Sequence, residues 1–204
     1  MKNRFAGMVA ACSMLALMTG AANALELAWV HANAAAQSEA RVKAGFDAWL
    51  KEQGKTDWNV SLLDSGGSGE ATATNIQDAA SRGVDAIVVT MADLRASRAA
   101  LDAARAAKIP VFAVDSGYTD GVLVDVTTNN WKMSADVSVY LLDQMGGKGN
   151  LIFLRMAEHH GTRKRGDVMA TVLKEYPDVK VLAEHNSDLA YANLAVRGKL
   201  IRQI

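Results

Sequence analysis

A strand–helix–strand pattern between Gly83 and Asp115 constrains the fold of this chain more than any other feature. The run from Ala86 to Val89 is apolar and mostly β-branched, which is typical of a strand buried on both faces of a parallel sheet. The stretch from Leu94 to Lys108 is rich in Ala, Leu and Arg and predicts a helix. Pro110 is expected to end that helix before a second buried strand, Val111 to Val114. Two strands joined by a helix in about 30 residues predict a right-handed βαβ unit.

Polar residues follow both strands of this unit, at Thr90 and at Asp115 and Ser116. In open α/β sheets, ligands bind just outside the carboxyl ends of the strands. Thr90 and Asp115 are therefore the first candidates for ligand contacts. The alternative for each of them is a local role, as a helix cap or a turn residue.

The same alternation of strand and helix patterns runs through the rest of the chain. Further strands are expected at 25–31, 58–63, 121–127, 150–155 and 179–184, and further helices at 37–53, 70–82, 130–145, 162–176 and 188–204. This order predicts an α/β chain with doubly wound parallel sheets. Five strands precede residue 128, so we expect one lobe over 25–128 and part of a second lobe over 129–204.

The first 24 residues have the pattern of a secretory signal peptide. Lys2 and Arg4 precede an apolar run at 5–18, and a small-x-small motif ends at Ala24, after which we expect cleavage. A membrane anchor is the alternative, but the run is shorter than the ~20 apolar residues that span a bilayer. A lipoprotein signal ending at Cys12 is a second alternative.

Composition after this cleavage narrows the possible functions. The remaining 180 residues lose two of the 22 basic residues and keep all 22 acidic ones, so their formal charge is −2. A near-neutral chain without a basic cluster argues against a nucleic-acid partner. Cys12 is the only cysteine, so the mature chain has no disulfide and must depend on its hydrophobic core.

Six stretches, taken in order, carry a family resemblance. These are the signal peptide, VKAGFDAWLKEQG, LLDSGGSGEATATNIQDAASRGVDAIVVTMAD, AAKIPVFAVDSG, TTNNWKMSADVSVYLLDQMGGKGNLIFL and GTRKRGDV. The chain resembles the periplasmic sugar-binding proteins of the ribose-binding type, which are solute receptors of ABC importers. The resemblance implies a type I periplasmic-binding-protein fold in which two lobes close on the ligand about a hinge. It implies a receptor in the periplasm, with neither enzyme activity nor a cofactor.

The implied partners are a small-molecule sugar or polyol and the membrane permease of an ABC importer, with a chemoreceptor as a further candidate. The resemblance also assigns residues in the first lobe. It places Asp115 where the family has an Asp that accepts hydrogen bonds from sugar hydroxyls, and Ser116 where an Arg is common. Thr90 stands at the position of an Asn that contacts the ligand.

The resemblance assigns two further candidate site residues, and the position of a residue at a strand end suggests a third. Arg163 matches an arginine that holds the ligand from the second lobe, with a solvated surface arginine as the alternative. Asn130 matches a polar position at the crossover between the lobes, where it serves the hinge more than the ligand. His31 ends the first strand and is either a cleft residue or a packed or solvent-facing histidine.

The chain also departs from the family pattern. The segment 32–38 lacks the Asn-Pro-aromatic cluster that stacks on a sugar ring, and the sequence ends before the family's remaining second-lobe strands. An exported α/β hydrolase and a non-functional truncated receptor are therefore alternatives to a sugar receptor. The hydrolase would need a nucleophile with a base or two spaced carboxylates, and no such set is recognisable in the sequence.

Two short motifs have local explanations. The glycine-rich segment 66–69 is followed by neither the Gly-Lys-Ser/Thr of a P-loop nor the last glycine of a nucleophile elbow, so we predict a loop and a helix start. The pair His159-His160 has no third ligand at helical spacing, so it is weak support for a metal site.

Overall fold

The structure is a computed structural model in which residues 24–186 are described. The proposed signal peptide, apart from Ala24, and the helix expected at 188–204 lie outside these residues. Within 24–186, no helix is both long enough and apolar enough to cross a membrane.

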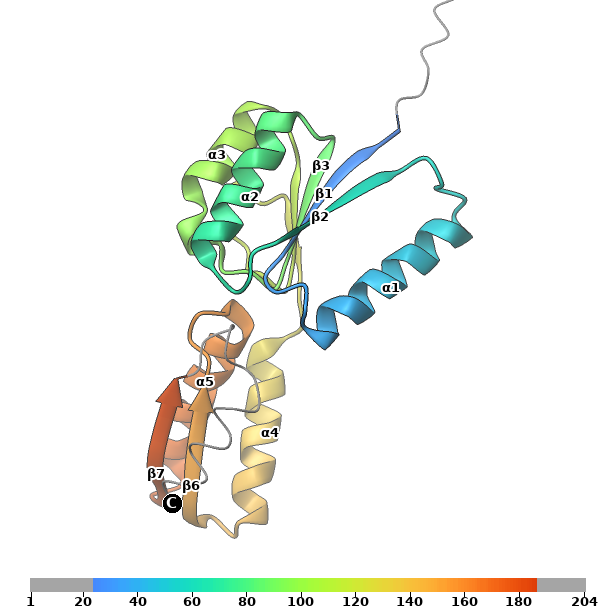
Figure 1. Ribbon diagram of the computed structural model, residues 1–204. Helices are drawn as coiled ribbons and strands as arrows, with labels where there is room; N and C mark the ends of the chain where they lie inside the picture. Colours follow the sequence, from blue (N-terminus) through green and yellow to red (C-terminus); the bar gives the residue numbers. More distant parts are fainter. Residues whose placement is uncertain (1–23, 187–204) are drawn as a thin grey trace, which may run out of the picture.

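Strands and helices alternate in the first part of the chain (Figure 1). The elements are β1 (Glu26–His31), α1 (Gln37–Glu52), β2 (Asn59–Asp64), α2 (Gly69–Arg82), β3 (Ala86–Thr90), the short 3-10 helix η1 (Leu94–Ala96), α3 (Arg98–Ala106), β4 (Val111–Val114) and β5 (Val124–Val126). The strands form one sheet in the order β2-β1-β3-β4-β5, and every neighbouring pair is parallel. The α/β class and the central βαβ unit are thus confirmed.

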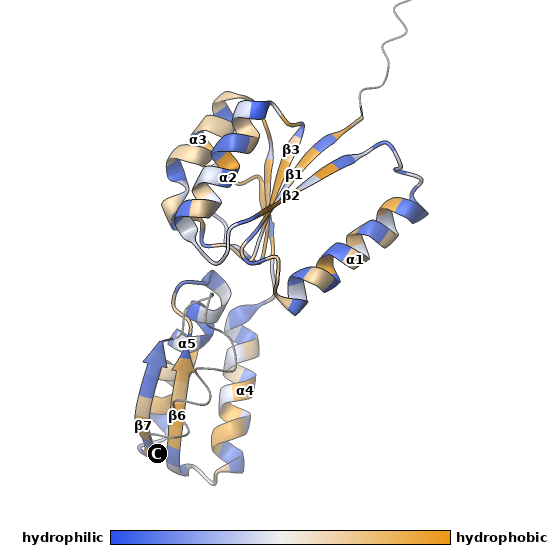
Figure 2. Cartoon of the chain, viewed as in Figure 1, coloured by the Kyte–Doolittle hydropathy of each residue, from blue (hydrophilic) through white to orange (hydrophobic). Residues whose placement is uncertain are grey.

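Helices lie on both faces of this sheet, with α2 and α3 on one side and α1 on the other (Figure 1). The strand residues that face α2 and α3 are buried, among them Val30, Ile87 and Val89. On the opposite face, the Trp29 ring meets Phe46 of α1 edge-on, with 5.0 Å between the ring centroids. The main core therefore lies between the sheet and the α2–α3 pair. Much of the length of the central strands is coloured as hydrophobic in Figure 2.

The second part of the chain forms a smaller unit. It contains α4 (Asn130–Gln144), β6 (Lys148–Arg155), α5 (His160–Val172), the 3-10 helix η2 (Leu173–Glu175) and β7 (Asp178–Asn186). Strands β6 and β7 pair in parallel, and Leu142, Met169 and Val179 are buried in the core of this unit. The change of sheet falls between β5 and α4, near the proposed lobe boundary at residue 128. The independence of the two lobes stays a prediction.

Two expected elements differ in detail. The helix expected over Leu94–Lys108 is divided, because η1 ends before Ser97 and α3 begins at Arg98. The Asp93 side chain caps η1 by accepting a hydrogen bond from the backbone N–H of Arg95. The helix also ends before Pro110, since Lys108 has a left-handed φ of 60°.

The strand expected at 121–127 contains only three residues. Gly121 has a φ of 98°, and the N–H of Val122 bonds to the carbonyl of Thr119 at 3.0 Å. The chain is therefore still turning where a strand was expected to begin.

Candidate functional site

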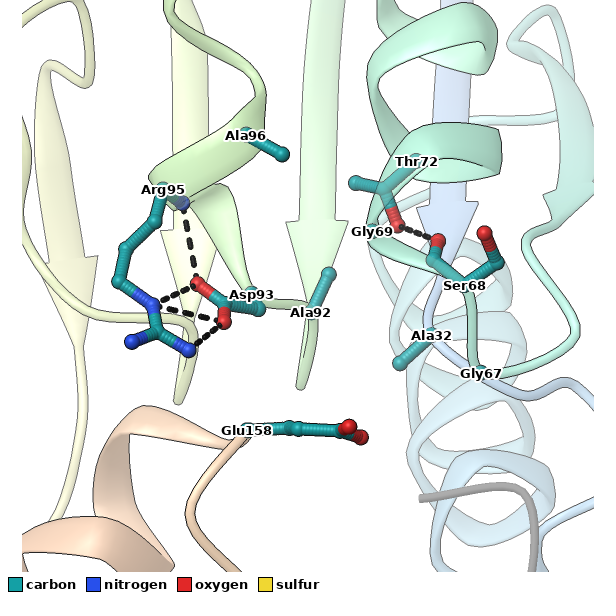
Figure 3. A pocket seen from close by; sticks show the side chains of 10 residues that line it. All are labelled: Ala32, Gly67, Ser68, Gly69, Thr72, Ala92, Asp93, Arg95, Ala96 and Glu158. Carbon is teal, nitrogen blue, oxygen red and sulfur yellow. Dashed lines mark hydrogen bonds and ion pairs between the residues drawn. The ribbon is translucent and has the colours of Figure 1, made fainter. Parts of the chain in front are cut away.

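A pocket of about 620 Å³ lies beyond the carboxyl ends of the first sheet's strands (Figure 3). Its lining comes from the segments that follow β1, β2, β3 and β6, and from the first turn of α2. The lining residues are Ala32, Gly67, Ser68, Gly69, Thr72, Ala92, Asp93, Arg95, Ala96 and Glu158. Nine of these ten come from the first unit, and Glu158 comes from the second.

The β2–α2 loop forms one wall of the pocket. Gly67 has a φ of 84°, which favours glycine, and its N–H bonds to the Ala32 carbonyl at 2.6 Å. Ser68 is the N-cap of α2, and its hydroxyl oxygen accepts a hydrogen bond from the Ala71 N–H at 3.2 Å. The predicted loop and helix start are confirmed, and the loop also lines the pocket.

An ion pair between Asp93 and Arg95 forms the opposite wall. The Asp93 carboxylate accepts hydrogen bonds from the Arg95 backbone N–H at 3.0 Å and from its Nε at 2.8 Å, and it also contacts Nη2. Partial burial raises the pKa of Asp93, but the hydrogen bonds and charge of Arg95 outweigh this and hold that pKa below its usual range. The same bonds raise the pKa of Arg95, with a smaller contribution from the charge of Glu158.

Glu158 enters the pocket from the loop between β6 and α5. Its side chain projects into the space between the Asp93–Arg95 pair and the Ala32–Gly67 side (Figure 3). The guanidinium of Arg163 donates a hydrogen bond from Nη1 to the Ala157 carbonyl at 2.8 Å. Arg163 therefore braces the loop that carries Glu158.

The predicted residues Asp115 and Ser116 directly follow β4 and are not among the residues that line the pocket. Asp115 has a left-handed φ of 49°, and its Oδ1 accepts a hydrogen bond from Thr127 Oγ1 at 2.6 Å. The Ser116 hydroxyl oxygen accepts a hydrogen bond from the Ala92 N–H at 3.2 Å. Ser116 thereby positions Ala92, which is a lining residue.

His31 and Thr90 are buried between the first sheet and the start of α1. Glu39, a buried residue in the first turn of α1, accepts hydrogen bonds from His31 Nδ1 at 2.6 Å and Thr90 Oγ1 at 3.0 Å. Thr90 Oγ1 also accepts a hydrogen bond from Trp29 Nε1 at 3.2 Å. The contacts of both residues are thus internal, and neither lines the pocket.

Asn130 begins α4 at the crossover between the two sheets. Its Oδ1 accepts a hydrogen bond from Arg165 Nε at 2.7 Å, and its Nδ2 donates to the Thr128 carbonyl at 3.3 Å. The bond from Arg165 ties α4 to α5, and the bond to Thr128 holds Asn130 against the crossover segment itself.

Comparison with known proteins identifies the family. Residues 28–197 match the periplasmic binding protein domain, which is most of the chain. This chain belongs to the periplasmic binding protein family. The resemblance to ribose-type binding proteins is confirmed by two curated relatives. The chain is 27% identical over 150 residues to the xylitol-binding protein of Mycolicibacterium smegmatis and 24% identical over 178 residues to the ribose import binding protein of Bacillus subtilis.

The alignments cover about seven-tenths of this periplasmic binding protein but less of its relatives. They span 72% of the chain and 42% of the M. smegmatis protein, and 71% of the chain and 57% of the B. subtilis protein. The chain thus spans about half the length of the curated relatives it matches.

Solved structures agree on the fold. An ABC sugar transporter subunit from Rhodobacter sphaeroides matches with a TM-score of 0.69 and 22% identity, over 87% of this chain and 61% of that one. A solute-binding protein from Agrobacterium vitis with bound allitol matches with a TM-score of 0.71 and 21% identity, over 88% and 60%. The fold is therefore that of type I periplasmic binding proteins, as expected.

None of the six predicted ligand residues is among those that line the pocket of this binding protein. Ser116 and Arg163 support lining segments, Asp115 and Asn130 lie near the crossover, and His31 and Thr90 are internal. Their roles in ligand binding stay predictions.

Sequence reasoning missed three charged residues of the pocket: Asp93, Arg95 and Glu158. Asp93 and Glu158 each lie three positions after the last residue of a strand. Ligands bind outside the carboxyl ends of strands, so a search of the complete loops after the strands, and not only of the first residue or two, would have found them.

The pair His159-His160 has structural contacts. His159 Nε2 bonds to the carbonyl of Asp115 at 2.7 Å, and His160 Nε2 lies 3.9 Å from Asp125 Oδ2. Over residues 24–186, no group of three or more His, Cys, Asp or Glu side chains is placed to hold a metal ion.

Proposed function

We propose that this chain belongs to the solute-binding component of an ABC-type import system and binds a neutral monosaccharide or polyol in the pocket. One observation carries the proposal: the pocket lies at the carboxyl ends of the first sheet and is lined from both units of the chain. A ligand there would contact both units, which suits a receptor that closes on its solute. The names of the relatives, which include ribose and xylitol receptors, support this class of ligand.

The groups that line the pocket favour binding over catalysis. The Ser68 hydroxyl oxygen caps α2, and the Thr72 hydroxyl donates to the Ser68 carbonyl at 3.0 Å. Among residues 24–186, neither hydroxyl is bonded to a base that could activate it as a nucleophile. Asp93 is held ionised by Arg95, so it is a poor general acid. These features support the receptor reading over the exported hydrolase.

A periplasmic location belongs to the same proposal. The positive start, the apolar run and the motif ending at Ala24 support a cleaved signal peptide. The proposed partner in the membrane is the permease of the importer, and a chemoreceptor is a further predicted partner.

A thermal-shift screen of the mature chain tests the proposal. The ligands are xylitol, ribitol, allitol, D-ribose, L-arabinose and D-fructose, with L-alanine as the control solute. A ligand that binds only the native state stabilises it by about 2.7 kcal/mol at a hundredfold excess over its Kd. We expect at least one neutral sugar or polyol, and not L-alanine, to raise the Tm. No shift with any of the six, or turnover of one of them, would overturn the proposal.

A further inference from the structure

Three charged residues line the pocket: Asp93 and Arg95 come from the first unit, and Glu158 comes from the second. Asp93 and Arg95 form an ion pair on the first-unit wall, and Glu158 enters the pocket from the second unit, with its carboxylate pointing toward the Ala32–Gly67 side (Figure 3). We propose that Glu158 is the specificity-determining residue of this pocket: it accepts hydrogen bonds from ligand hydroxyls and excludes ligands that carry an acid group. This inference rests on the proposed function, because it assumes that the pocket is the ligand site.

The Glu158 carboxylate is free to meet a ligand. It is exposed, and among residues 24–186 it forms neither an ion pair nor a side-chain hydrogen bond. Asp93, by contrast, is engaged by both the backbone N–H and the guanidinium of Arg95. Of the two carboxylates that line the pocket, Glu158 is therefore the one not engaged by another group, and a carboxylate oxygen is a strong acceptor for hydroxyl donors.

The opposite wall offers a matching donor. Arg95 uses Nε and Nη2 on Asp93, and its Nη1 makes no hydrogen bond within the described part of the chain. A hydroxyl group both donates and accepts. A polyhydroxylated ligand can thus donate to Glu158 and accept from Arg95 at the same time, which would join the two walls.

Charge then decides between neutral and acidic ligands. One cation and two carboxylates give the pocket wall a formal charge of −1, and the Arg95 cation is already paired. A carboxylate or phosphate on the ligand would meet the Glu158 carboxylate, and two like charges at such short range repel each other. Neutral sugars and polyols avoid this repulsion, whereas the sugar acids and sugar phosphates do not.

Isothermal titration calorimetry on the mature chain tests this role with matched ligands. The probes are xylitol with D-xylonate and D-ribose with D-ribonate, which differ within each pair by one acid group. We expect wild type to bind the neutral member of a pair at least tenfold more tightly than the acid. Glu158→Gln should weaken the neutral ligand about tenfold, because a charged acceptor becomes a neutral one, and should reduce the discrimination against the acid.

Glu175→Gln is the matched control, because Glu175 is an exposed carboxylate of the same unit in η2, away from the pocket. It should leave both affinities unchanged. Glu158→Ala is a second test of the same group and should also lose discrimination. Circular dichroism and the Tm should match wild type in both Glu158 variants, since Glu158 is exposed and its side chain is not part of the buried core.

The outcomes separate this inference from the proposed function. If neutral ligands bind but the Glu158 variants keep the wild-type discrimination, the inference is overturned and the receptor function stands. An equal loss for neutral and acidic ligands would also overturn it, because it would indicate a role in closure alone. If no neutral ligand binds wild type, both fail together.

Discussion

The imidazole of His159 donates a hydrogen bond from Nε2 to the backbone carbonyl of Asp115 at 2.7 Å, and this bond joins the start of α5 to the end of β4. The other ring nitrogen, Nδ1, accepts a hydrogen bond from the Thr162 N–H at 3.3 Å and so caps α5. The two roles require the neutral tautomer with its proton on Nε2. One buried side chain thus caps a helix of the second unit and ties that unit to the first.

His159→Asn should separate these two roles. Asn is a good N-cap but is too short to reach Asp115, so the helix keeps its cap while the bond between the units is lost. We expect a loss of about 1 kcal/mol in the free energy of unfolding, and a larger loss for His159→Ala, which lacks both interactions. Urea denaturation measures the difference. Equal stability of the Asn and Ala variants would contradict the assigned capping role.

Stability should fall when the pH drops below about 6.5, and His160 should account for part of the fall. Burial, with the positive charge of Lys164, lowers the pKa of His160 below its ordinary value of 6.5, although Asp125 and Asp115 act in the opposite direction. The unfolded chain therefore binds a proton at a higher pH than the native chain, so protonation favours unfolding. Stability from this group is intact above pH 6.5 and is lost as the pH falls through the window below it.

The measurement is the Tm of wild type and His160→Gln between pH 7.5 and 5.5. We expect the variant to show a smaller decrease in Tm than wild type over this range. A His160→Gln slope equal to that of wild type would contradict the prediction.

Gly117→Ala should destabilise the contact between the units. Gly117 has a φ of 89°, and a Cβ there would lie 2.9 Å from Cγ of His160. The substitution combines backbone strain with overpacking, for which we expect about 2–4 kcal/mol in total. Gly54→Ala is the matched control, because Gly54 has a φ of 64° but no atom within 4 Å of an added Cβ. Gly54→Ala should lower the free energy of unfolding by only the strain of a left-handed backbone, about 1 kcal/mol. Equal losses by urea denaturation would show that the His160 contact is not tight.

Leu142→Ala should loosen the second unit more than the first. Leu142 is fully buried at 0% exposure in the core that contains Met169 and Val179, so truncation should cost about 2–5 kcal/mol. Leu154→Ala is the control, since Leu154 is 52% exposed. Hydrogen–deuterium exchange should increase in α4, α5 and β6 but not in β1, β3 and β4. An equal increase in both sets would contradict the proposed division into two lobes.

The local elements were predictable because short-range chemistry decides them. The helix expected at 70–82 ends at Arg82 as α2, and Gly83 caps it with a left-handed φ of 70°. The apolar strands β3 and β4 formed where their β-branched residues predicted a buried parallel sheet. The division of the helix at Ser97 was not predictable, because it depends on the Asp93 side chain capping η1, and the helix-forming composition around it hides the break.

The sequence alone determined the order of strands and helices, the α/β class and the family, because these depend on residue periodicity, turn residues and ordered local similarity. Only the tertiary structure decided which polar residues meet. Thr90 and Glu39 are 51 positions apart and bond beneath α1, while Asp93 and Glu158 face the same pocket from different units. The physical reason is that the sequence shows which residues at a strand end are polar but not where their side chains point. Alternation fixes side-chain direction only within a strand, and beyond its end the direction depends on the loop conformation and on the packing of distant segments.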